Sequence, residues 1–154
     1  MDVIFKGSNL IFKVSKPILA NLYRNGGLNN YANANKVSTE FLDCSAYAGK
    51  TLSVYTDRPN SMYNDEISYE YYYEMIFSSA ESLIGTAPAV LAANLPGVIK
   101  NIGDAKWETL QQIPNNAICV SICINERVKI GDTTVNNPLR KEDFDKYRIG
   151  FRLE

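Results

Sequence analysis

The sequence predicts an all-β protein built as an antiparallel, jelly-roll-like β-sandwich. Several runs of residues alternate between two faces, as expected of strands with one buried face. A short link containing Gly49 separates two of these runs, which is typical of a hairpin or of a corner between two sheets. The runs that predict the fold are Val37–Cys44, Thr51–Thr56, Ile67–Ser78 and Ala117–Asn125.

Length, composition and charge narrow the classes of function. A chain of 154 residues with 45% hydrophobic and 21% charged residues is typical of one globular domain with its own core. The net charge of −1 disfavours nucleic acid as a partner and gives no reason to expect an anionic membrane surface. The apolar groups near the N-terminus are too short for a secretion signal, and no stretch approaches the ~20 apolar residues of a membrane span.

The residue types that carry most enzyme chemistry are missing or badly spaced. The chain has no histidine, the commonest general base and metal ligand. Its three cysteines, Cys44, Cys119 and Cys123, lack the spacing of a zinc site or a disulfide framework. Glu70 and Glu74 share a strand face at about 13 Å, beyond the roughly 5–9.5 Å of glycosidase carboxylates. The sequence therefore predicts no enzyme, no catalytic residue, no cofactor and no metal site.

The two ends of the chain are predicted to lie outside the sandwich. We expect an N-terminal hairpin and arm over residues 1–35, a sandwich core over residues 36–126, and a C-terminal extension over residues 127–154. Two short apolar groups on either side of Gly7–Asn9 predict the hairpin. Tyr147–Leu153 alternates cleanly and predicts a final strand that pairs with its own sheet or with a neighbouring subunit.

The segment Ser79–Asp104 is ambiguous. Pro88–Asn94 is either a short helix ended by Leu95–Pro96–Gly97 or part of a long apolar loop, and Val98–Ile102 is expected to add an edge strand. If the apolar loop is exposed, it is a candidate interface. After it, Lys106–Ile113 predicts another strand, which ends at the turn beginning with Pro114.

The chain is rich in aromatic residues, with ten tyrosines and a single tryptophan. A surface rich in Tyr and Asn suits recognition, because tyrosine offers contact area with little loss of entropy. For Trp107 and the tyrosines of Ile67–Ser78, structural packing is the favoured interpretation, and a sugar-binding platform is the alternative. The residues that form a candidate glycan platform are Trp107, Tyr72 and Tyr55.

Two motifs carry a resemblance to a known module. The first is a strand ending in D-x-S-x-Y-x-G-K and followed by a T-L-S-V strand, matched by Asp43, Ser45, Tyr47, Gly49 and Lys50. The second is an I-P-x-x-A turn followed by a V-S-I strand, matched by Ile113, Pro114, Ala117, Val120 and Ser121. Over residues 36–125 the chain thus resembles a β-sandwich module of tailed-phage virion proteins, of the head-fibre, auxiliary-capsid or tail-fibre type.

The resemblance implies a structural or receptor-facing role in a phage particle and carries over no active-site residues. The leading hypothesis is a virion protein, assembled in the bacterial host cytoplasm as an auxiliary capsid, decoration or head-fibre-anchoring subunit. Its expected partners are capsid or fibre proteins and further copies of itself, contacted through the terminal extensions. The alternative is a lectin-like carbohydrate-binding module that recognises host-surface glycans.

Overall fold

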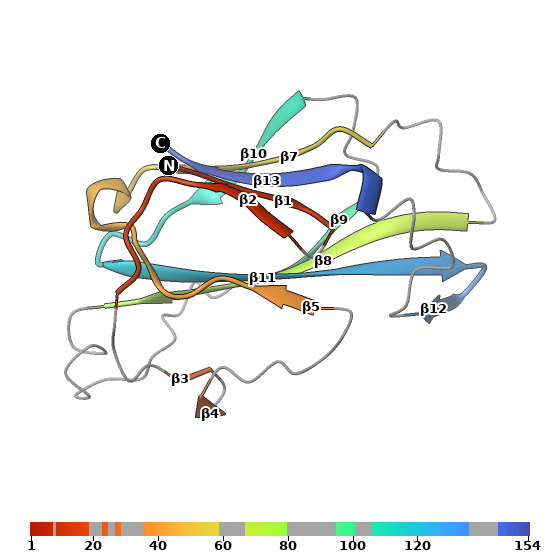
Figure 1. The fold of residues 1–154 in the computed structure, drawn as a ribbon, viewed down its shortest axis with the longest axis horizontal. Helices are drawn as coiled ribbons and strands as arrows, with labels where there is room; N and C mark the ends of the chain where they lie inside the picture. Colours follow the sequence, from red (N-terminus) through yellow and green to blue (C-terminus); the bar gives the residue numbers. More distant parts are fainter. Residues whose placement is uncertain are drawn as a thin grey trace.

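A computed structural model of the chain shows two antiparallel β-sheets that form the layers of a sandwich (Figure 1). The described residues are 1–7, 9–18, 23–24, 27–28, 36–58, 67–79, 95–100, 106–135 and 145–154, and in part of the strands only the backbone is described. The predicted all-β sandwich is confirmed. Its finer description as jelly-roll-like stays a prediction.

The first layer, sheet A, has five strands, and each neighbouring pair is antiparallel. Its edge strands are β10 (Lys106–Gln112) and β2 (Asn9–Lys13). Between them lie, in this order, β7 (Thr51–Thr56), β13 (Arg148–Leu153) and β1 (Asp2–Lys6). The first and last strands of the chain are therefore neighbours in the interior of one sheet.

The second layer, sheet B, is built on β11 (Cys119–Ile130) and β8 (Ile67–Ser78), which pair along their whole length. β9 (Leu95–Lys100) pairs with the free side of β8 and forms an edge. The expected edge strand is therefore present but begins earlier, at Leu95. Pro96 and Gly97 lie inside it, not at a helix end, because an edge strand tolerates a residue without an N–H. The helix considered over Pro88–Asn94 lies outside the described residues.

Three short strands share the other side of β11. They are β6 (Leu42–Asp43), β5 (Lys36–Ser38) and β12 (Thr133–Val135), paired one after another along β11. A separate ribbon of β3 (Tyr23–Arg24) and β4 (Gly27–Leu28) belongs to neither sheet. These two strands lie in the segment predicted to be an N-terminal arm.

The strand predicted over Val37–Cys44 is interrupted at Thr39, which separates β5 from β6. The Thr39 hydroxyl oxygen accepts the backbone N–H of Ile122 at 3.0 Å, and the Thr39 carbonyl accepts the Ser121 hydroxyl at 3.0 Å. Side-chain groups thus replace some of the backbone hydrogen bonds that join neighbouring strands elsewhere in the sheet. Period-two patterning does not detect this, because threonine fits a strand equally well.

The link around Gly49 is a corner between the layers. β6 pairs with β11 in sheet B, and β7 pairs with β13 and β10 in sheet A. The short 3₁₀ helix η1 (Ser45–Tyr47) lies between them. Gly49 has a φ of +74°, and an added Cβ would lie 2.8 Å from the Asn115 side chain, so glycine is required at this corner. Of the two interpretations left open, the corner is the one observed.

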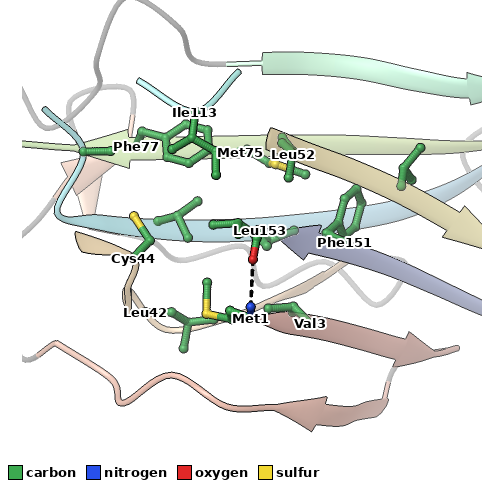
Figure 2. Close-up of a cluster of buried hydrophobic side chains, with 14 of the residues drawn as sticks. Met1, Val3, Leu42, Cys44, Leu52, Met75, Phe77, Ile113, Phe151 and Leu153 are labelled. Atoms are coloured by element: carbon green, nitrogen blue, oxygen red, sulfur yellow. Dashed lines mark hydrogen bonds between the residues drawn. The ribbon is translucent and has the colours of Figure 1, made fainter. Parts of the chain in front are cut away.

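The core lies between the layers and draws on both (Figure 2). Full burial of an aliphatic or aromatic side chain stabilises a fold by roughly 1.5–3 kcal/mol. Sheet A contributes Val3, Phe5, Leu52, Val54, Ile149, Phe151 and Leu153. Sheet B contributes Leu42, Met75, Phe77, Val120, Ile122 and Ile124.

The first and last strands lie inside sheet A and not outside the sandwich, and of the two pairings left open for the final strand, the one with its own sheet is observed. β1 and β13 pair with each other, and their inward side chains, such as Phe5 and Phe151, have no exposed surface. The Met1 amino group also donates a hydrogen bond to the Leu153 carbonyl at 2.8 Å (Figure 2). The alternating pattern predicted both strands correctly. It carried no information on which strands they would pair with, because pairing between distant segments is a tertiary property.

Candidate functional site

The structure brings two of the three candidate platform residues together on sheet A. Trp107 of β10 and Tyr55 of β7 are directly paired, and their ring centroids lie 5.1 Å apart with planes inclined by 31°. Tyr72 belongs to β8 in sheet B, where its backbone pairs with Val98 and Asn125. Its side chain is outside the described part of the structure. The three residues therefore do not share one sheet.

Trp107 and Tyr55 begin a row that crosses the outward face of all five strands of sheet A. The glycine in this row makes room for the indole. A Cβ added at Gly150 would lie 3.1 Å from Trp107 Cη2 and 3.4 Å from Ile4 Cγ1. The indole therefore lies across β13 instead of standing away from the sheet. In register, the row is Trp107, Tyr55, Gly150, Ile4 and Phe12.

An arginine held by a carboxylate covers the tryptophan ring. The guanidinium carbon of Arg152 lies 3.9 Å from the centre of the Trp107 ring. Two of its nitrogens each donate to a different oxygen of Asp2 at 2.8 Å. These hydrogen bonds from Arg152 are the main cause that lowers the pKa of Asp2 and raises the pKa of Arg152. The interaction connects β1, β13 and β10 across the face.

A second arginine, Arg148, contacts Tyr55 and is also held by an aspartate. Arg148 Nε donates to Asp57 Oδ2 at 2.8 Å, and its backbone N–H donates to Asp57 Oδ1 at 2.6 Å. Its guanidinium also donates to the Tyr55 hydroxyl at 3.3 Å and lies 5.9 Å from the ring centre. The hydrogen bond to Asp57 is the main cause that raises the pKa of Arg148. The two Arg–Asp pairs thus lie on either side of the aromatic residues along β13.

This geometry fits packing better than sugar stacking or acid–base chemistry. The guanidinium of Arg152 lies over one face of the Trp107 ring, and Asp2 holds it there, so a sugar ring cannot stack on that face without displacing it. Asp2 is ionised and accepts two hydrogen bonds, the opposite of a general acid kept protonated near neutral pH. These cation–π contacts and Arg–Asp pairs connect four strands of the sheet. We name this cluster, Asp2, Tyr55, Asp57, Trp107, Arg148 and Arg152, the aromatic clamp.

The other end of the same row carries exposed apolar side chains. Within the described residues, the exposed large apolar side chains are Ile11, Phe12 and Val14, with exposed fractions of 49%, 48% and 62%. A β-bulge between Ile4 and Phe5 leaves Ile11 as an extra residue in β2. Phe12 pairs with Ile4 on the outward face of sheet A. We name Ile11, Phe12 and Val14 the apolar strip.

The three cysteines are buried, and their thiols are expected to react slowly. All three are free thiols, and burial raises the pKa of Cys44 to about 12 and that of Cys119 to about 11. Among the described residues, no group of three or more Cys, Asp or Glu side chains is placed to hold a metal ion. No helix within the described ranges is long and apolar enough to cross a membrane.

Sequence reasoning found part of this surface. It predicted the final strand, which carries Arg148 and Arg152, and singled out Trp107 and Tyr55. It missed Asp2, Asp57 and the apolar strip, because ordinary acidic and apolar residues carry no local signal of an outward-facing cluster. No family model matches the chain, and no curated protein or solved structure matches it significantly.

Proposed function

We propose that the chain is a non-enzymatic structural protein of a tailed-phage virion. In this proposal it is an auxiliary capsid, decoration or head-fibre-anchoring subunit, assembled in the host cytoplasm and bound to capsid or fibre proteins. The observation that carries the proposal is the apolar strip, since a run of exposed apolar side chains marks a surface that a partner covers. The motif resemblance over residues 36–125 is the reason for proposing that this partner belongs to a phage virion.

The contact surface in this proposal differs from the terminal extensions that the sequence led us to expect. Because β1 and β13 lie inside sheet A, the ends of the chain are not free arms over their whole length. β2 remains available at the edge of sheet A. The residues after it are held beside sheet B, since the Ile18 N–H donates to the Phe41 carbonyl at 2.6 Å and the Asp43 N–H donates to the Lys16 carbonyl at 3.0 Å. The docking surface is therefore assigned to the apolar strip and not to the final strand.

The proposal is tested on phage particles that carry the gene. Mass spectrometry of gradient-purified particles is expected to find the chain in stoichiometric amount, and its absence from intact particles would contradict the proposal. Particles lacking the protein are then incubated with purified wild-type chain or with the Phe12→Ser variant. Wild-type chain is expected to co-sediment with the particles and the variant to remain in the supernatant. Thr109→Ser, on the opposite edge strand β10, is the matched control.

The adjacency of Trp107 and Tyr55 favours one alternative, a lectin-like module for host-surface glycans. A glycan array separates the two proposals. Retention of a glycan by the wild type and its loss in a folded Trp107→Ala variant would favour the lectin. For the structural subunit, we expect no retention by either protein, because Arg152 occupies the face of the indole.

A further inference from the structure

We draw no further inference here: the strongest candidate, the apolar strip of Ile11, Phe12 and Val14 at the β2 edge of sheet A, is the surface already assigned under the proposed function, and nothing in the structure shows what covers it.

Discussion

Arg152 lies with its guanidinium carbon 3.9 Å from the centre of the Trp107 ring, while its nitrogens hold both carboxylate oxygens of Asp2. Asp2 and Arg152 are 150 positions apart in the sequence. The contact therefore connects both ends of the chain to the edge strand β10 through one side chain. Arg152 thus lies over the ring of a tryptophan that the sequence singled out as part of a candidate glycan platform.

The pair between Asp2 and Arg152 predicts a pH-dependent loss of stability. Its hydrogen bonds lower the folded-state pKa of Asp2 below the ordinary 3.8. A depressed carboxyl pKa stabilises the fold above the unfolded-state pKa, and this contribution is lost as pH falls through the folded-state pKa. We expect Asp2→Asn to cost about 1 kcal/mol in urea unfolding at neutral pH. The gap to wild type should narrow as pH falls below the ordinary pKa of 3.8 and through the folded-state pKa of Asp2, and a gap independent of pH would contradict this assignment.

The close approach at Gly150 predicts a change in tryptophan fluorescence. A Cβ at this position would lie 3.1 Å from Trp107 Cη2, so the indole of Gly150→Ala must move. We expect a shifted emission maximum and a loss of about 1 kcal/mol, the lower end of overpacking costs. Gly131→Ala is the control, because its cost comes from a φ of +57° with no atoms within 4 Å of the added Cβ. An unchanged emission spectrum in Gly150→Ala would show that the indole does not rest on β13.

Burial of the thiols predicts slow labelling in the native state. With pKa values of about 12 for Cys44 and about 11 for Cys119, only a very small fraction of either is thiolate at pH 8. We expect labelling by an aromatic disulfide reagent to be slow in buffer and complete within seconds in denaturant. The labelling rate in buffer should follow the unfolding equilibrium, and rapid labelling of the folded protein would contradict the burial of these side chains.

The central position of β13 predicts that the last strand cannot be removed. Deletion of residues 148–154 takes Ile149, Phe151 and Leu153 from the core and exposes the facing edges of β1 and β7. Loss of one large core side chain alone costs about 3–5 kcal/mol. We therefore expect the truncated chain to lack a cooperative thermal transition, as followed by circular dichroism. A folded truncation that merely failed to associate would restore the interpretation of this strand as an extension.

The sequence predicted the elements better than their partners. Alternation located β7, β8, β11 and β13, and the Pro114 turn is present, with the Ala117 N–H donating to the Pro114 carbonyl at 3.1 Å. The same alternation did not reveal that Thr39 interrupts a strand, because a hydroxyl that joins the ladder leaves the pattern unchanged. It also assigned both chain ends to extensions, because the motifs that carry the resemblance lie within residues 36–125.

What the sequence determined by itself is the class of fold, because period-two patterning follows from the geometry of a single strand. The sequence also shows directly that the chain contains no histidine. Only the tertiary structure decided the order of the strands in sheet A. That order determines which side chains are covered and which are exposed. Trp107 is covered because Gly150 and Arg152 come from a strand more than forty positions away. Ile11 and Phe12 are exposed because β2 lies at an edge, and pairing between distant segments assigns that position.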